Sequence, residues 1–342
     1  MENIPYAADE GVDPAIVAFI ERSGLVEGAA SVAMARLAGG VASDIWKVTA
    51  GGRSFAVKRA LARLRVAEEW IVPVSRNASE VEWMLAAGRI APGAVPEILA
   101  HDRAISAYAM TFLDPATHPV WKDELRAGRA DRAFAAALGE TIAGIHSATA
   151  GSTDVARRFA NDGAFHAIRL EPYLEAAARA HPDLADPLLR LSRDTLACKT
   201  ALVHGDVSPK NILVGAKGPV ILDAECAWYG DPAFDLAFCL NHLLLKCLWT
   251  PASRADFLAC FDALSRAYLG RVDWEAPDGL EARAARLLPA LLLARVDGKS
   301  PVEYVTRDGD KDSIRRIARP LILAGPRRLA AVRDAWAKEI AA

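Results

Sequence analysis

The stretch His204-Gly-Asp206-Val-Ser-Pro-Lys-Asn211, followed after a short gap by Val220-Ile-Leu-Asp223, decides the fold of this 342-residue chain. Apolar runs at 201–203 and 212–214 flank the polar loop, and a third run ends in Asp223. Short apolar runs bounded by turn residues are typical of strands. The pattern therefore predicts a small hairpin with its turn at 215–219.

Three polar side chains, Asp206, Asn211 and Asp223, are predicted at loop positions on one edge of this hairpin. An Asp, an Asn five residues later and a second Asp after a strand form the arrangement that kinases use. In it, Asp206 orients a hydroxyl group and accepts its proton, because an aspartate of ordinary acidity is ionised at neutral pH. Asn211 and Asp223 offer the hard oxygen ligands that suit Mg²⁺.

These residues resemble a known family. His204-Gly205-Asp206, Asn211 and the run ending in Asp223 are similar to the aminoglycoside phosphotransferase and choline kinase group of small-molecule kinases. Gly205 stands where most protein kinases have Arg, and Ser208 where they usually have Lys; both are typical of the small-molecule branch. The resemblance implies an α+β, protein-kinase-like fold of two lobes, with ATP and Mg²⁺ as cofactors.

Length and composition agree with an ordinary folded chain that is large enough for two lobes. The 41 basic and 43 acidic residues give a net charge of −2, which offers no support for a nucleic-acid or membrane partner. We find no signal peptide or membrane-spanning run, and the five cysteines contain no CxxC pair. We expect a cytoplasmic monomer or homodimer that acts on a small molecule.

The N-lobe is predicted at 1–113. Strands at 32–37 and 45–49 flank a loop that contains Gly39 and Gly40, whose backbone amides can approach phosphate because glycine has no Cβ. A glycine pair by itself is more often a plain hairpin turn. Its place before a strand ending in Lys58 favours the nucleotide-binding interpretation.

Lys58 matches the strand lysine that pairs nucleotide phosphates with a helix carboxylate. The carboxylate should lie on the next predicted helix, at 79–87, where Glu80 and Glu82 both qualify. They point about 200° apart, so only one can face the site. Placing the apolar residues of the helix toward the core favours Glu80.

The segment after Lys58 resembles methylthioribose kinases, in which a lysine strand runs into an Ala-Leu-x-x-x-Arg motif and a Glu-x-Trp segment. The matching residues here are Ala60-Leu61, Arg65, Glu69 and Trp70. Glu225, two residues after Asp223, also resembles that branch. It is predicted either to supplement the metal site or to serve as a cap or loop residue.

The C-lobe is predicted at 114–342. A strand at 108–114 should run into the hinge, where the backbone of Met110 and Phe112 would contact adenine. Helices are predicted at 131–150 and 170–198 and, after the catalytic loop, at 236–250, 253–269, 281–296 and 312–340, the last interrupted by Pro320 and Pro326. His146, His204, Asp231 and Asp235 are expected to have structural roles.

The C-terminal helices should build the acceptor pocket. Arg315 and Arg316 resemble the twin arginines that contact the sugar in methylthioribose kinases, and Arg suits hydroxyl-rich or anionic ligands. A solvated helix face is an equally common place for such a pair. A cationic aminoglycoside would need carboxylates instead, which the acidic run between Asp273 and Glu281 could provide.

Together these observations predict a kinase that uses ATP and Mg²⁺ to phosphorylate a hydroxyl of a methylthioribose-like sugar or polyol. Two alternatives remain open at this point. One is an aminoglycoside or amino-alcohol kinase of the choline or homoserine type. The other is a nucleotide-binding pseudokinase with a regulatory role, against which the presence of Lys58, Asp206, Asn211 and Asp223 together argues.

Overall fold

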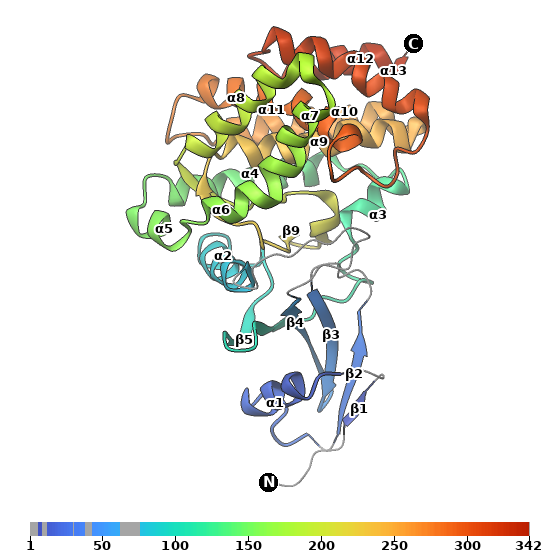
Figure 1. The fold of residues 1–342 in the computed structure, drawn as a ribbon. Coiled ribbons are helices and arrows are strands. Elements are labelled where there is room, and N and C mark those ends of the chain that lie inside the picture. The colour runs from blue at the N-terminus through green and yellow to red at the C-terminus, as the bar shows by residue number, and fades with distance from the viewer. Residues whose placement is uncertain (1–5, 9–11, 30, 38–42, 62–75, 342) are drawn as a thin grey trace.

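A computed structural model describes residues 6–8, 12–29, 31–37, 43–61 and 76–341. The chain folds into two lobes (Figure 1): a β-rich lobe from the N-terminal part of the chain, and a larger body built mainly of helices. The predicted α+β, protein-kinase-like fold class is confirmed.

The N-terminal lobe is built on a six-stranded sheet of order β1-β2-β3-β4-β6-β5, antiparallel except for the β1–β2 pair. In the register, Lys58 lies opposite Ile45 on one side and Tyr108 on the other. Helix α1 begins after Asp13, which caps the amide of Ala15. The elements of this lobe are β1 (Tyr6–Ala8), α1 (Pro14–Arg22), β2 (Val32–Arg36), β3 (Ser43–Ala50), β4 (Arg53–Ala60), α2 (Arg76–Ile90), β5 (Ile98–Asp102) and β6 (Ala107–Thr111).

Helix α2 is longer than predicted and packs against the helical lobe. Its buried Val81, Trp83 and Met84 belong to the core of that lobe, whereas α1 and the sheet form a separate small core. The predicted helix ends before Gly88, but α2 continues through this residue to Ile90. A Cβ at Gly88 would lie 3.2 Å from a methyl carbon of Val95, so close packing explains a glycine inside the helix.

The helical lobe surrounds one deeply buried helix, α9 (Ala233–Trp249), which is apolar almost all round and therefore a core helix. The other helical elements of the lobe are α3 (Trp121–Arg126), α4 (Arg132–Thr149), α5 (Thr153–Arg158), α6 (Asp162–Phe165), the π-helical η1 (His166–Glu175), α7 (Ala176–Ala180), η2 (Pro182–Leu184), α8 (Ala185–Ala197), η3 (Pro209–Asn211), η4 (Pro251–Ser253), α10 (Arg254–Leu269), α11 (Pro277–Asp297), α12 (Asp308–Ala324) and α13 (Leu329–Ala341).

Two predicted helices differ from the structure. The continuous helix expected at 170–198 is instead η1, α7, η2 and α8, because Pro172 and Pro182 have no N–H to give to a regular α-helical ladder. The last helix is interrupted as predicted before Pro326, where Gly325 adopts a left-handed conformation with φ 60°. Pro320, in contrast, lies within α12 and does not interrupt it.

Two small antiparallel pairs complete the lobe. Strands β8 (Ile212–Gly215) and β9 (Gly218–Ile221) form the predicted hairpin. Strand β7 (Ala201–Val203) pairs instead with β10 (Trp228–Gly230). No helix in the described part of the chain is long and apolar enough to cross a membrane.

Candidate active site

The loop after β7 is held in place by Asp235, at the start of α9. Its Oδ2 accepts a hydrogen bond of 2.7 Å from the amide of His204, and its Oδ1 accepts one of 2.8 Å from the amide of Gly205. Nε2 of the buried His146 lies 3.2 Å from the same carboxylate. Asp235 thus satisfies two buried donors that have no strand partner. This placement agrees with the structural roles expected for Asp235 and His146.

His204 connects the loop to the neighbouring hairpin. Its Nδ1 accepts from the amide of Asp206 at 3.0 Å, and its Nε2 donates to the carbonyl of Leu222 at 3.1 Å. Its ring meets the ring of Trp83 edge to face, with 4.7 Å between centroids. Burial lowers the pKa of His204 despite the nearby carboxylates of Asp235 and Asp206. A neutral, fully engaged imidazole is a positioning residue of the loop.

Gly205 allows the loop to pass close to the segment after β9. Its φ is +81°, and a Cβ at this position would lie 2.8 Å from the carbonyl oxygen of Cys226. Both the conformation and the close approach require glycine here.

We expect Gly205→Ala to destabilise the fold by about 3 kcal/mol, because a left-handed alanine costs about 1–2 kcal/mol and the Cys226 contact adds an overpacking cost. Gly24→Ala is the matched control, since Gly24 has φ +72° and no atom within 4 Å of a Cβ. It should lose only about 1 kcal/mol. Urea unfolding of the two variants measures the difference in the free energy of unfolding. Equal losses in the two variants would show that the Cys226 contact does not contribute to the cost of Gly205→Ala.

Asp206 lies on this loop, almost completely buried, between two cations. Its Oδ2 is 2.9 Å from Arg169 of η1 and 3.3 Å from Lys210. Its backbone carbonyl accepts from Nδ2 of Asn211 at 3.1 Å. Burial would raise the pKa of Asp206, but the positive charges of Lys210 and Arg169 outweigh it, and the pKa lies below its usual value. Asp206 is therefore an ionised carboxylate at neutral pH.

Lys58 stands at the junction of the two lobes. Its Nζ lies 2.8 Å from Glu80, 2.6 Å from Asp223 and 3.1 Å from Glu225. Burial disfavours the ammonium, but these carboxylates outweigh it and raise the pKa of Lys58. Glu82, the other candidate on α2, points away and pairs with Arg103 and Arg158.

Asp223 follows β9 with a φ of +67°, which is unusual for a residue other than glycine. Burial acts to raise the pKa of its carboxyl, yet Lys58 and Lys210 outweigh that effect and lower it. The carboxylate side chain is nonetheless 38% exposed, so it remains open to a ligand from the cavity. A strained backbone that aims an ionised carboxylate at a cavity is typical of a functional position.

Glu225 bridges the lobes through both carboxylate oxygens. Oε1 accepts from Ser43 of β3 at 2.9 Å and also faces Lys58, while Oε2 accepts from Nε of Arg76 at 2.8 Å. Sequence reasoning missed Arg76, which begins α2. Nothing in the local sequence of Arg76 indicates this partner, because Glu225 lies 149 residues further along the chain.

The residues available to a metal fit a hard cation. Carboxylate oxygens of Glu80, Asp223 and Glu225 lie within 4.8 Å of one another, although Lys58 contacts all three. Asn211 is held beside Asp223, because its carbonyl accepts from the amide of Leu222 at 2.8 Å. Among the described residues, nothing donates to the amide oxygen Oδ1 of Asn211. Oxygen ligands from an amide and a carboxylate are the donor set that Mg²⁺ prefers.

The remaining nucleotide-contacting candidates lie at the edge of the sheet. Met110 is in β6, and Phe112 follows that strand directly, on the segment that leads to the helical lobe. The ammonium of Lys47 lies over the Phe112 ring, 4.5 Å from its centroid. Gly39 and Gly40, like Arg65, Glu69 and Trp70, lie outside the described residues.

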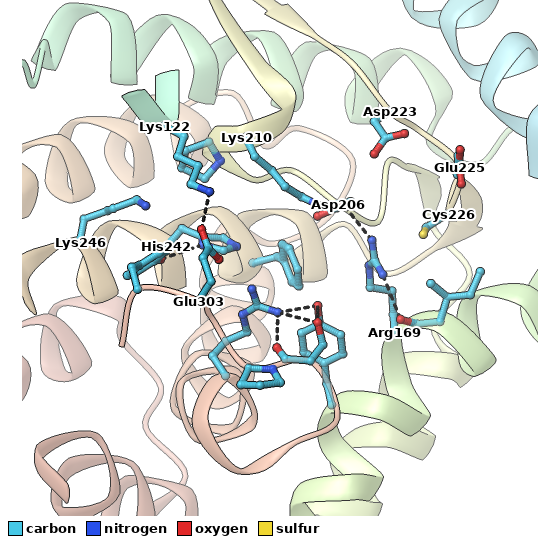
Figure 2. A pocket seen from close by; sticks show the side chains of 18 of the residues that line it. Lys122, Arg169, Asp206, Lys210, Asp223, Glu225, Cys226, His242, Lys246 and Glu303 are labelled. Carbon is cyan, nitrogen blue, oxygen red and sulfur yellow. Dashed lines mark hydrogen bonds and ion pairs between the residues drawn. The ribbon is translucent and has the colours of Figure 1, made fainter. Parts of the chain in front are cut away.

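A cavity of about 360 Å³ opens beside Asp206 (Figure 2). Residues of α3, η1, α9 and α11 line it, together with the loop after β7 and the segment after α11. Its lining includes Lys122, Ile168, Arg169, Tyr173, Asp206, Lys210, Asp223, Phe238, His242, Lys246, Arg295, Ser300, Glu303 and Tyr304.

The structure does not bring Arg315 and Arg316 to this cavity. They line a separate, shallow hollow on α12 with Asp312, Arg319 and Pro320. Arg315 is paired with Asp297 and Asp312, and Arg316 with Glu339, so both guanidinium groups are engaged by neighbours. A resemblance of sequence cannot reveal such local partners.

The acidic run considered for a cationic acceptor also lies elsewhere. Asp273 accepts from Ser147, and Glu275 pairs with Arg283. Asp278 and Glu281 both pair with Arg328. None of these carboxylates lines the cavity that contains Asp206.

Sequence reasoning missed the residues that do form the far end of the cavity. His242 and Lys246, four residues apart on α9, lie on the same face as Phe238. A histidine and a lysine at this spacing within an otherwise apolar helix were the available signal. Lys122 and Arg295 come from distant parts of the chain and carry no local pattern.

A β-rich lobe and a helical lobe meet at Lys58, with Asp206, Asn211 and Asp223 at the junction, and this arrangement is a protein-kinase-like fold. The chain belongs to the phosphotransferase enzyme family, whose pattern it matches over residues 33–280. The predicted family is confirmed.

Individual relatives agree with this assignment. A methylthioribose kinase of Erwinia tasmaniensis is 28% identical over 225 residues, which is 58% of this chain and 56% of that protein. The chain thus spans about half the length of the curated relatives it matches. An ethanolamine kinase of Plasmodium vivax has the same fold at 12% identity, with a TM-score of 0.54 over 92% of this chain and 86% of that one. An amicoumacin kinase solved with AMP-PNP and Ca²⁺ has a TM-score of 0.51 at 13% identity, over 93% of this chain and 95% of that one.

Proposed function

We propose that the protein transfers the γ-phosphoryl group of ATP to a hydroxyl of a small polyhydroxylated molecule, a sugar or polyol. The observation that carries this proposal is the junction of the lobes, where the ionised Asp206 opens onto the cavity that Asp223 also lines. Residues 1–113 would act as the nucleotide-covering N-lobe, and residues 114–342 as the C-lobe that holds the acceptor. We expect a cytoplasmic monomer or homodimer.

The nucleotide would lie under the sheet, with adenine against the backbone of Met110 and Phe112 and phosphates near Lys58. The pair between Lys58 and Glu80 keeps the ammonium directed at this space. Gly39 and Gly40, which lie outside the described residues, would contact the phosphates through their backbone amides. The amicoumacin kinase that shares the fold was solved with a nucleotide analogue and a divalent cation, which supports a nucleotide and a divalent metal here.

Asn211 and Asp223 would hold Mg²⁺, which would neutralise charge on the transferred phosphate. Glu225 is less suited to this role than expected, because Ser43, Lys58 and Arg76 already engage both of its oxygens. We therefore assign to Glu225 the bridging of the two lobes around the metal site.

Asp206 would act on the acceptor. Its carboxylate would accept the hydroxyl proton while the hydroxyl oxygen forms a bond to the γ-phosphorus and the bond from that phosphorus to the bridging oxygen of ADP breaks. A carboxylate with a lowered pKa is a weak base. A weak base is sufficient here, because a loose transition state requires mainly positioning and charge neutralisation from the protein. Arg169 and Lys210 keep the base ionised and fix its orientation.

The acceptor class rests on two observations. The curated relatives that match are methylthioribose kinases, and the cavity offers hydroxyl and amine groups from Tyr173, Ser300 and Tyr304 and from several lysines.

ADP release with ATP, Mg²⁺ and a panel of sugars, polyols, choline and aminoglycosides tests the proposal. Release that requires an acceptor and stops with EDTA is expected; release with no acceptor dependence would refute it.

Asp223→Asn should lower turnover roughly 100-fold and raise the Mg²⁺ concentration needed for half-maximal rate, because a neutral amide binds a divalent cation more weakly than a carboxylate. Asp312→Asn is the matched control, since Asp312 is exposed on α12 and lies outside the cavity that contains Asp206. Initial rates at increasing Mg²⁺ measure both. An unchanged Mg²⁺ dependence in Asp223→Asn would remove Asp223 from the metal site.

A further inference from the structure

The far end of the cavity gathers four basic side chains, Lys122, His242, Lys246 and Arg295, which we call the basic recess. In Figure 2, Asp206 lies between Asp223 and Glu225 on one side and His242, Lys246 and Glu303 on the other. The recess is therefore on the side of Asp206 away from Asp223 and Glu225, the side where the acceptor rather than the nucleotide would bind.

Lys246 is the central group of the basic recess. The residue is 1% exposed, and within the described ranges its side chain makes no hydrogen bond or ion pair. Its Nζ lies 3.8 Å from the ring centroid of Trp249 and 3.7 Å from that of Tyr304. Burial away from a carboxylate disfavours the ammonium form of Lys246, so an anionic ligand in the cavity would favour that form.

Arg295 adds a second cation without an acidic partner in the part of the chain that is described. Its Nη1 donates to the hydroxyl of Tyr173 at 2.9 Å and to the backbone of Ser300 at 2.5 Å. These bonds fix the guanidinium in place but leave its charge uncompensated. Lys122 is paired with Glu303, the acidic residue at this end of the cavity, so positive groups exceed negative ones.

The two aromatic rings also argue against a quaternary ammonium acceptor such as choline. Such ligands are recognised by cages of aromatic faces. Here Nζ of Lys246 already lies against the faces of Trp249 and Tyr304. A ligand cation at this end would meet Lys122 and Arg295, and the carboxylate of Glu303 is already paired with Lys122.

We propose that the acceptor carries an anionic group, a carboxylate or a phosphate, which binds in the basic recess while a hydroxyl of the same molecule faces Asp206. This inference rests on the proposed function, because it identifies the recess as part of the acceptor site. It narrows the acceptor to hydroxylated acids and sugar phosphates and separates it from neutral methylthioribose.

Binding should also be coupled to proton uptake. Burial and the charge of Lys122 lower the pKa of Lys246 to about 6, with Glu303 acting in the opposite direction. Arg295 of α11 and Asp123 of α3 act on it as well, and His242 is its neighbour on α9. An anion against Lys246 favours the ammonium and raises its pKa. At pH 7, where the free lysine is mostly neutral, the complex therefore takes up a proton.

Calorimetric titration of the full chain, loaded with AMP-PNP and Mg²⁺, tests the proposal with three probes on one carbon skeleton. Ribonate carries a carboxylate, ribitol 5-phosphate carries a phosphate, and ribitol is the neutral reference. We expect at least one anionic probe to bind ten-fold or more tightly than ribitol. The binding heats measured in bis-Tris and in Tris at pH 7 should differ, because the buffer supplies the proton that Lys246 takes up and the two buffers have different enthalpies of ionisation.

Lys246→Met keeps most of the length and the apolar stem of the side chain and removes its amine. It should reduce the preference for the anionic probe at least ten-fold and abolish proton uptake, while the affinity for AMP-PNP stays unchanged. Lys338→Met is the matched control, because Lys338 is exposed on α13. Arg295→Met is a second variant that should also weaken the preference, should Lys246→Met fail to fold.

Three outcomes would overturn the inference: ribitol binding as tightly as both anionic probes, a preference that survives in Lys246→Met and Arg295→Met, or a loss of AMP-PNP affinity in Lys246→Met. The proposed function fails in a different measurement. An anionic probe that binds through Lys246 but gives no ADP release with ATP would refute phosphoryl transfer to this acceptor class and leave the anion site in place.

Discussion

Asp206→Asn should reduce acceptor-dependent ADP release by about 10³-fold, because the amide keeps the shape of the side chain but cannot accept the hydroxyl proton. The loop should stay in place, since the backbone of residues 204–206 is held by Asp235 and by the His204 ring rather than by the Asp206 carboxylate. Affinity for a nucleotide analogue, measured by calorimetry, should therefore change little.

The pH dependence of the wild-type rate provides a second test of the same residue. The pKa of Asp206 lies below its usual value because Lys210 and Arg169 outweigh the effect of burial. The base therefore remains ionised as the pH falls from 7 to 5, and the rate should not decline over this range on its account. A group with a raised pKa in this role would show the opposite, a loss of rate on mild acidification.

A rate for Asp206→Asn within ten-fold of wild type would contradict the assignment of the base. Loss of nucleotide affinity together with the rate would instead show that the substitution disturbs the loop. Separate measurement of the two quantities distinguishes these cases.

Asp235→Ala should lower the free energy of unfolding by about 3–5 kcal/mol. The substitution leaves the amides of His204 and Gly205 buried without acceptors, and each such group costs about 1–3 kcal/mol. It also removes the partner of Nε2 of His146. For a chain of this size a loss of that magnitude corresponds to roughly 10 °C in Tm.

Urea unfolding and thermal melts measure this effect. Asp256→Ala is the control, because Asp256 is exposed at the start of α10, where Arg132 lies 3.7 Å from its carboxylate. Its unfolding free energy should change by less than about 0.5 kcal/mol. If Asp235→Ala were as stable as this control, Asp235 would not be the residue that holds the catalytic loop.

The sequence was sufficient for those parts of the fold and candidate site that local pattern determines. The hairpin of β8 and β9 follows from apolar runs and turn residues, and the helix face that places Glu80 beside Lys58 follows from the apolar positions of α2. Asn211 and Asp223 lie side by side for the same reason, since they flank paired strands.

The acceptor end of the cavity could not be predicted in the same way. Lys122, Lys246 and Arg295 come from three helices far apart in the sequence, and their convergence depends on how α3, α9 and α11 pack. The choice of Arg315 and Arg316 rested on resemblance, and their carboxylate partners Asp297 and Glu339 could only be seen in the folded chain.

The most direct test of phosphoryl transfer is ³¹P NMR of the purified chain with ATP, Mg²⁺ and the pooled acceptors ribitol, ribonate, ribitol 5-phosphate, methylthioribose and choline. We predict a new phosphomonoester signal that grows in step with ADP as the γ-phosphate signal of ATP declines, and its absence with Asp206→Asn. ADP accompanied only by inorganic phosphate, or a phosphomonoester formed equally well by Asp206→Asn, would contradict transfer to an acceptor hydroxyl at Asp206.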